Sequence, residues 1–141
     1  MGAIYQISIF LENRKGSLSE VTRVLADSGI NLRALSIADT TDFGILRVIV
    51  DDVDGAKNAL DEIGVVSKIT DVIAVKIDDK TGGLASVLDT LSVAGVEIEY
   101  MYAFLGREEG RALMVIKTAA DDAAEKVLLD AKIALLDQAE L

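Results

Sequence analysis

The chain has 141 residues, of which 51% are hydrophobic and 27% are charged, and its formal net charge is −10. This composition can bury a core and excludes a disordered chain, while the length allows one ordinary domain or two small ones. The acidic excess, with no cluster of Lys or Arg, argues against nucleic acid or an anionic membrane surface as a partner.

The sequence contains no Cys and no His. Disulfides, thiolate nucleophiles, Cys-based metal sites and the commonest proton shuttle are therefore unavailable, and we expect a cytoplasmic protein without a cofactor. Charged residues interrupt every apolar run before the ~18 residues that a membrane-spanning helix needs. The first ten residues pass directly into a strand pattern, so we expect no signal peptide.

Residues 5–11 alternate between apolar and polar side chains, which predicts a half-buried strand. A helix follows, and Gly29 is expected to end it with a positive φ. The apolar stripe of this helix consists of Leu18, Val21 and Leu25.

Residues 30–38 and 43–50 are the next predicted strands, and the short polar connection "DTTD" between them favours an antiparallel hairpin. A second helix passes through residues 56–63. The segment 65–79 then holds a further strand and runs into the second half of the chain without Gly or Pro.

The same pattern recurs in the second half. Gly16, Gly29 and Gly44 return 66 residues later as Gly82, Gly95 and Gly110, which predicts a duplication whose register does not slip. The corresponding predicted strands lie at 71–77, 96–105 and 111–117, and the helices at 84–91 and 124–131.

Each half therefore has the order strand, helix, strand, strand, helix, strand. This order predicts an α+β protein of two tandem ferredoxin-like domains, each an antiparallel sheet with its two helices on one face. We expect domains at 1–70 and 71–141, joined at Asp71 by a strand-like crossover instead of a flexible linker.

The segments "ENRKGSLSEVTRVLADSGINL" (12–32) and "DDKTGGLASVLDTLSVAGVEI" (78–98) resemble the ACT domain pattern of strand, polar turn, Gly-x-Leu, helix and Gly-Ile-Asn-Ile/Leu. The resemblance covers nearly the whole chain. The chain is similar to small stand-alone proteins made of two ACT domains. It implies a regulatory module that binds an amino acid and signals through association, with an unidentified metabolic enzyme as a partner.

In the ACT family, ligands bind at domain interfaces, between the turn that opens the first helix and the second strand of a neighbouring domain. A helix N-terminus offers unpaired N–H groups to a ligand carboxylate, and Gly16 permits close approach. The resemblance therefore implies as ligand-binding residues Asn13, Lys15, Gly16, Ser17, Leu18, Asn31 and Leu32.

Structural explanations exist for the same residues. Gly16 also suits a turn, and Ser17 with Glu20 forms the capping-box pattern "SLSE". Asn31 follows a helix-ending glycine, where an Asn commonly bonds to its own backbone. Glu97 stands at the corresponding place in the second half, so we expect the ligand site in the first half. The second half is then either degenerate or contributes across the interface.

Tyr100, Tyr102 and Phe104 alternate on one predicted strand. They are interpreted either as sheet packing or as a pocket wall for an apolar ligand side chain, and Tyr100 and Tyr102 join the candidate site. The acidic residues Asp39, Asp42, Glu99, Glu108 and Glu109 are interpreted as a solvated face, and no metal site is assigned.

Three functions remain open: a non-catalytic amino-acid-binding regulator, a structural adaptor without a ligand site, and an enzyme. The lack of His, Cys and any phosphate-loop or nucleophile-elbow spacing argues against an enzyme. Leu46, Val48 and Val50 are expected to face the helices, which leaves Ile45, Arg47 and Ile49 on the opposite sheet face. That apolar face predicts contact with another sheet or subunit, and a homodimer.

Overall fold

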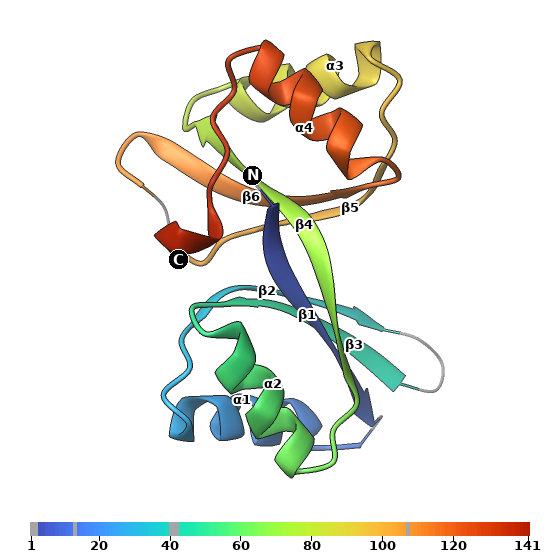
Figure 1. Cartoon of the computed structure of the whole chain (residues 1–141), viewed down its shortest axis with the longest axis vertical. Coiled ribbons are helices and arrows are strands. Elements are labelled where there is room, and N and C mark those ends of the chain that lie inside the picture. The colour runs from blue at the N-terminus through green and yellow to red at the C-terminus, as the bar shows by residue number, and fades with distance from the viewer. Residues whose placement is uncertain (1–2, 13, 40–42, 107) are drawn as a thin grey trace. The chain divides into compact units, whose positions relative to one another are not determined.

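The computed structural model describes residues 3–12, 14–39, 43–106 and 108–141. The chain divides into two compact units (Figure 1). The N-terminal unit comprises Tyr5–Thr70 with Leu141, and the C-terminal unit comprises Asp71–Glu140 with the start of the first strand.

The N-terminal unit forms an antiparallel sheet in which β3 lies between β1 and β2. Beyond β1, the Phe10 N–H donates to the carbonyl oxygen of Val66 at 3.0 Å. The elements are β1 (Ala3–Glu12), α1 (Ser17–Asp27), β2 (Leu32–Asp39), β3 (Phe43–Val50) and α2 (Val53–Glu62).

The C-terminal unit repeats this arrangement, with β6 between β4 and β5. β4 continues without a break through Asp71, as the predicted strand-like crossover requires. The elements are β4 (Ser67–Asp78), α3 (Gly83–Val93), β5 (Ile98–Ala103), β6 (Arg111–Thr118), α4 (Asp121–Asp130) and the short 3-10 helix η1 (Gln138–Glu140).

The last predicted strand of the second half is reduced to an isolated bridge between Leu135 and Val75. Two backbone hydrogen bonds hold it: Lys76 N–H to Ala134 O at 2.9 Å, and Leu136 N–H to Ala74 O at 2.8 Å. Apart from this shortened strand, the predicted ferredoxin-like order is confirmed in both halves.

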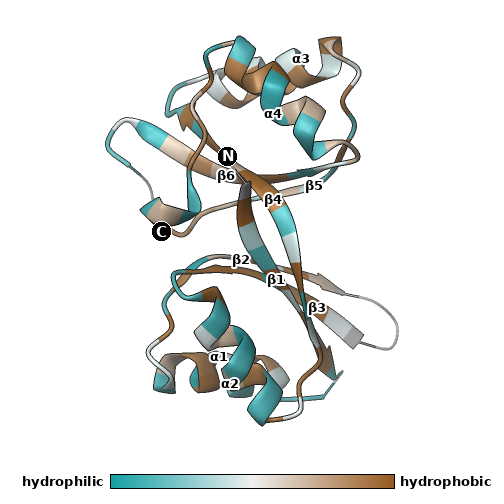
Figure 2. Cartoon of the chain, in the orientation of Figure 1, coloured by the Kyte–Doolittle hydropathy of each residue, from teal (hydrophilic) through white to brown (hydrophobic). Residues whose placement is uncertain are grey.

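Each unit has its own core between the sheet and two helices. Leu46, Val48 and Val50 lie in the N-terminal core with the stripe residues Val21 and Leu25, as predicted. Figure 2 shows the helices banded in brown and teal, as expected for amphipathic helices that pack on a sheet. The C-terminal core contains Ile73, Val75, Ile77, Val87, Leu91, Ile116, Ala124 and Leu128.

The prediction that the 66-residue register never slips is wrong in the β5–β6 hairpin. Gly44 pairs with Leu11, whereas the residue paired with Ile77, 66 positions later, is Ala112. Gly110 instead occupies the turn, with φ 72°. The second hairpin is therefore two residues longer, and β6 and α4 follow their counterparts by 68 residues.

The capping-box interpretation of Ser17 is also wrong. The N-cap is Gly16, in the left-handed conformation with φ 87°, and it makes no side-chain capping bond. Ser17 is the first helical residue, and the Glu20 carboxylate pairs with Arg14 instead of the helix end. The predicted helix-ending role of Gly29 and Gly95 is confirmed, since their φ angles are 75° and 76°.

The sheet face opposite the helices carries Arg47 and Ile45, both partly buried, and Ile49, which is fully buried. In the part of the chain that the structure describes, no helix combines the length and apolar character needed to cross a membrane.

Candidate functional site

The turn after β1 changes the chain direction from strand to helix. The Arg14 N–H donates to Glu12 O at 2.8 Å, and the Ser17 N–H donates to Arg14 O at 3.3 Å. Gly16 has a positive φ that other residues adopt only with strain, and its carbonyl accepts the Glu20 N–H at 2.9 Å. A cavity lies beside this turn.

This N-terminal cavity has a volume of about 460 Å³, within the range of small-molecule sites. The end of β1, the turn, the first turns of α1 and the connection after α2 form its walls. The lining residues are Phe10, Leu11, Glu12, Arg14, Ser17, Glu20, Val21, Ile63, Gly64, Val65 and Val66.

Arg14 is the cation of this cavity and lies between two carboxylates. Its Nε donates to Glu12 Oε2 at 3.1 Å, and one Nη donates to Glu20 Oε2 at 2.6 Å. The hydrogen bond with Glu20, and then that with Glu12, raises the pKa of Arg14 above its ordinary value. A guanidinium has five N–H groups, so three remain for a ligand.

The opposite wall is apolar and comes from a distant part of the sequence. α2 ends at Glu62, Gly64 follows with φ 73°, and the chain then passes along the cavity through Val65 and Val66. The side chain of Val66 is 68% exposed, and that of Ile63 is also exposed. The cavity thus combines a charged edge with an exposed apolar wall.

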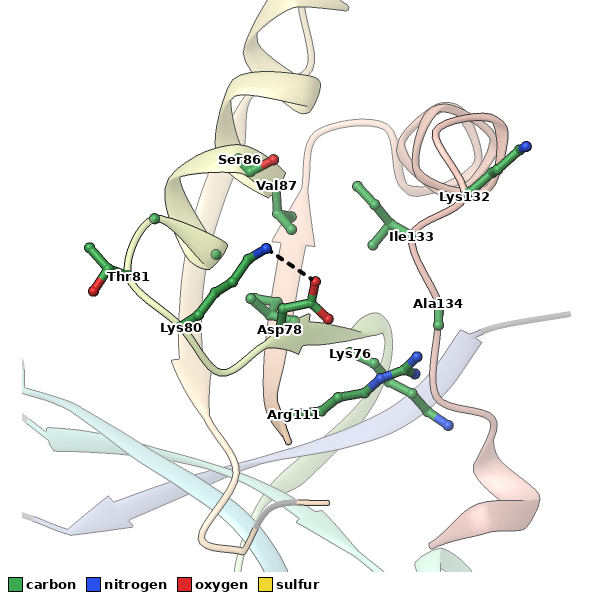
Figure 3. Close-up of a pocket in the computed structure, with 13 residues that line it drawn as sticks. Lys76, Asp78, Lys80, Thr81, Ser86, Val87, Arg111, Lys132, Ile133 and Ala134 are labelled. Carbon is green, nitrogen blue, oxygen red and sulfur yellow. Dashed lines mark ion pairs between the residues drawn. The ribbon is translucent and has the colours of Figure 1, made fainter. Parts of the chain in front are cut away.

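The C-terminal unit has a corresponding cavity of about 280 Å³, shown in Figure 3. It lies between the end of β4, the first turns of α3, the start of β6 and the connection after α4. Its lining residues are Lys76, Ile77, Asp78, Lys80, Thr81, Gly82, Gly83, Ser86, Val87, Arg111, Lys132, Ile133 and Ala134.

Most lining positions of the two cavities correspond, but the cavities differ in chemistry. Relative to the N-terminal cavity, Arg14 becomes Lys80 and Glu20 becomes Ser86, so a carboxylate is lost. Gly64 becomes Lys132, which keeps a positive φ of 62°. The C-terminal cavity is therefore the more cationic of the two.

Lys76 lies where the N-terminal cavity has Phe10, and its side chain is only 14% exposed. Its Nζ lies 2.9 Å from Glu140 Oε2 and 3.3 Å from Glu108 Oε1. The hydrogen bond with Glu140 raises the pKa of Lys76 against the opposing effect of burial, and the same bond lowers the pKa of Glu140. This network connects η1 to β4.

The predicted residues of the first turn lie at or near the N-terminal cavity. Ser17 lines it and is 8% exposed, while Lys15, Gly16 and Leu18 are exposed beside it. Asn13 lies outside the described residues.

Asn31 and Leu32 lie at the other end of α1. The Asn31 N–H donates to Asp51 Oδ1 at 3.0 Å, and the Asp51 N–H donates to Asn31 O at 3.3 Å. The 11 residues of α1, about 16 Å of helix, separate Asn31 from Gly16. Within one unit, these two parts of the predicted site are not brought together.

Tyr100 and Tyr102 belong to β5 of the C-terminal unit. Met101 between them packs against the core below the helices, so the two tyrosines point to the opposite sheet face. Tyr102 is 8% exposed. This placement agrees with the sheet-packing interpretation and does not test the pocket-wall interpretation.

The acidic residues do not form a metal centre within the described ranges. No group of three or more acidic side chains there is arranged to hold a metal ion. Glu108 pairs with Lys76 instead, and Asp42 lies outside the described residues. Glu99 and Glu109 are exposed, as predicted for a solvated face.

Sequence reasoning missed Arg14 as a candidate ligand group and missed the apolar wall of residues 63–66. Arg14 was visible in the quoted turn motif, but its six-residue separation from Glu20 matches no helix spacing. Residues 63–66 reach the cavity only through the fold, so local sequence patterns carried no signal for them.

Comparison with known proteins agrees with the fold. The model of the "ACT domain pair" family matches residues 2–141. A crystal structure of a protein from Bacteroides thetaiotaomicron is 45% identical with a TM-score of 0.91, and the match covers 99% of this chain and 98% of that chain.

Two other matches are to named regulatory or small subunits. The ligand-free regulatory subunit of aspartate kinase from Thermus thermophilus has a TM-score of 0.62 at 17% identity, with 93% of this chain and 97% of that chain covered. The acetolactate synthase small subunit of Buchnera aphidicola subsp. Baizongia pistaciae (strain Bp) is 33% identical over 76 residues, 52% of this chain. That match spans 47% of the Buchnera protein, about half its length. Because the family model covers almost every residue, the chain belongs to the ACT domain pair family.

Proposed function

We propose that this protein is a non-catalytic regulatory module that binds a free amino acid in the N-terminal cavity. The observation that carries the proposal is the position of Arg14 between Glu12 and Glu20 beside an apolar wall. An α-amino acid has the complementary parts: a carboxylate, an ammonium and a side chain.

In the proposed complex, the ligand carboxylate accepts hydrogen bonds from the remaining N–H groups of Arg14. The ligand ammonium lies between the carboxylates of Glu12 and Glu20. An apolar ligand side chain then packs against Val21, Val65 and Val66. This contact removes apolar surface of both the ligand and the protein from water.

The residues expected from the family resemblance are part of the same proposal. Lys15, Gly16, Ser17 and Leu18 form the rim, and N–H groups of the first helical turn give the carboxylate an alternative partner. Asn31, Leu32, Tyr100 and Tyr102 contribute only where a neighbouring domain supplies them. We assign the two ACT domains to residues 1–70 and 71–141, and the cytoplasmic location stays a prediction.

The regulatory part of the proposal is supported by the relatives that are named as a regulatory subunit of aspartate kinase and a small subunit of acetolactate synthase. By analogy, an amino acid signal passes from this module to a metabolic enzyme. The alternative is an adaptor that associates with partners without binding a ligand.

A thermal-shift panel of the common amino acids separates these functions. Binding at a hundredfold excess over Kd adds about 2.7 kcal/mol to the free energy of unfolding, so the binding amino acid raises the melting temperature clearly. Calorimetry then gives its Kd for wild type and for Arg14→Ala, which should bind at least about tenfold more weakly.

Arg23→Ala is the matched control, because Arg23 is an exposed arginine of α1 that does not line the cavity. Its affinity should equal that of wild type. If no amino acid stabilises the protein, the adaptor function is favoured. Equal affinities of the Arg14 and Arg23 variants would place the amino acid elsewhere.

A further inference from the structure

We propose that the C-terminal cavity is a second site of different specificity, which binds a small dianion such as a phosphate or a dicarboxylate. The proposal does not depend on amino-acid binding in the N-terminal cavity. It rests on the difference between the charged residues that line the two cavities. Because both cavities belong to one chain, each can be compared directly with the other.

The charged groups differ in sign between the cavities. Among the residues that the structure describes, one cation, Arg14, and two carboxylates line the N-terminal cavity. The described lining of the C-terminal cavity has four cations and one carboxylate, Asp78. Even with the two glutamates that pair with Lys76, the described cations exceed the described carboxylates by one. In a chain with a net charge of −10, this cavity is an exception that favours an anion.

Lys80 and Arg111 are the groups that can bind the anion. In Figure 3 the Lys80 ammonium points toward Asp78, at 3.9 Å, and Arg111 belongs to the lining of the same cavity. No ion pair joins Arg111 to a carboxylate among the described residues. Lys132 points away from the others, so it contributes charge at the rim and no direct contact.

The Lys80–Asp78 pair is weak enough for a ligand to replace it. Both side chains are largely exposed, and 3.9 Å is too long for a hydrogen bond between them. A dianion that bridges Lys80 and Arg111 gains two charge-assisted contacts and loses only this loose pair.

The rest of the cavity limits the size of the ligand. Lys76 is already held by Glu108 and Glu140, so it closes the cavity beside β4 and does not need the ligand as a partner. Gly83 brings the start of α3 close to β4, since a Cβ atom there would clash with the carbonyl oxygen of Asp78. The volume of about 280 Å³ suits a phosphate or a short dicarboxylate.

The test is a titration of the full chain, followed by the backbone amide signals in two-dimensional NMR at constant ionic strength. The probes are inorganic phosphate and succinate, which separate the two sources of a dianion. We expect at least one probe to give saturable shifts in residues 80–86 and not in residues 14–20.

Four variants test the contacts. Lys80→Met and Arg111→Met should each raise the Kd about tenfold, and Ser86→Glu, which restores the carboxylate of the other cavity, should also raise it. Asp78→Asn should lower the Kd several-fold, because it removes the one lining carboxylate that repels the anion. A gain of affinity cannot come from a damaged fold.

Lys126→Met, on the exposed side of α4, is the charge-matched control and should bind like wild type. The proposal is overturned if neither probe gives saturable shifts. It is equally overturned if Lys80→Met and Arg111→Met bind the probe as tightly as Lys126→Met does.

Discussion

At the residue scale, the C-terminal ends of α2 and α4 give a direct comparison of two side chains in one backbone conformation. Gly64 and Lys132 have φ angles of 73° and 62°, and their N–H groups donate to Asp61 O and Leu129 O. The left-handed conformation suits glycine and strains lysine. Lys132 therefore keeps a conformation that its own side chain disfavours.

We predict that Lys132→Gly stabilises the protein by about 0.5–1 kcal/mol, since relief of the strain exceeds the entropic cost of glycine in the unfolded chain. Urea unfolding measures the change. Lys126→Gly, inside α4, should destabilise by about 1 kcal/mol. A destabilised Lys132→Gly would contradict the prediction.

Asn31 binds Asp51 through its own backbone N–H and C=O groups, and its side chain makes no hydrogen bond within the described part of the chain. We therefore predict that Asn31→Ala changes the free energy of unfolding by less than about 0.5 kcal/mol. If Asn31 contacts the amino acid, the same variant weakens binding by about 1.5–3 kcal/mol, which calorimetry detects. Unchanged affinity would remove Asn31 from the site.

At the scale of elements, the C-terminal segment after α4 is attached to β4 at two levels. Backbone hydrogen bonds join Lys76 to Ala134 and Leu136 to Ala74, and the Lys76–Glu140 pair adds a charged contact. The lowered pKa of Glu140 means that its carboxylate is favoured in the folded state. The Lys76–Glu140 pair therefore contributes fully to stability at pH values above the pKa that Glu140 has in the unfolded chain.

We predict that the attachment weakens as the pH falls through the lowered pKa of Glu140, where the carboxylate becomes protonated. At neutral pH, Glu140→Gln should reduce the hydrogen-exchange protection of the Leu136 amide relative to wild type. The difference between the two proteins should disappear in acid. Glu62→Gln, an exposed change on α2, should have no such effect, and equal protection of Leu136 in all three proteins would contradict the prediction.

At the scale of the whole molecule, large apolar side chains remain exposed in both units. Val93 is 90% exposed, and Leu105, Val66 and Ile37 are also exposed. Apolar surface of this kind favours association.

We predict a homodimer, which light scattering should report as a particle of twice the 15.0 kDa chain mass. Dilution should shift the mass toward that of the monomer if the dimer is weak. A mass of one chain at every concentration would count against the prediction.

The sequence by itself determined the elements, their faces and the duplication. Alternation in residues 5–11 and the spacing of Val21 and Leu25 are local patterns, and local periodicity indicates which side of a strand or helix is buried. Leu18, the first residue of the predicted stripe, is nevertheless exposed. For the same reason, the family pattern of turn, helix and strand was recognisable before the structure.

Only the tertiary structure decided the register of the second hairpin and the composition of the cavities. Gly110 lies 66 residues after Gly44 and was expected to be its structural counterpart. In the sheet, however, Ala112 is the counterpart, because cross-strand hydrogen bonds and not sequence distance fix the register. Arg14 and the segment after α2 line one cavity, and Lys80 and Arg111 line the other, only because the fold brings distant segments to one end of a helix. The chemistry of a cavity depends on such distant neighbours, which no local pattern specifies.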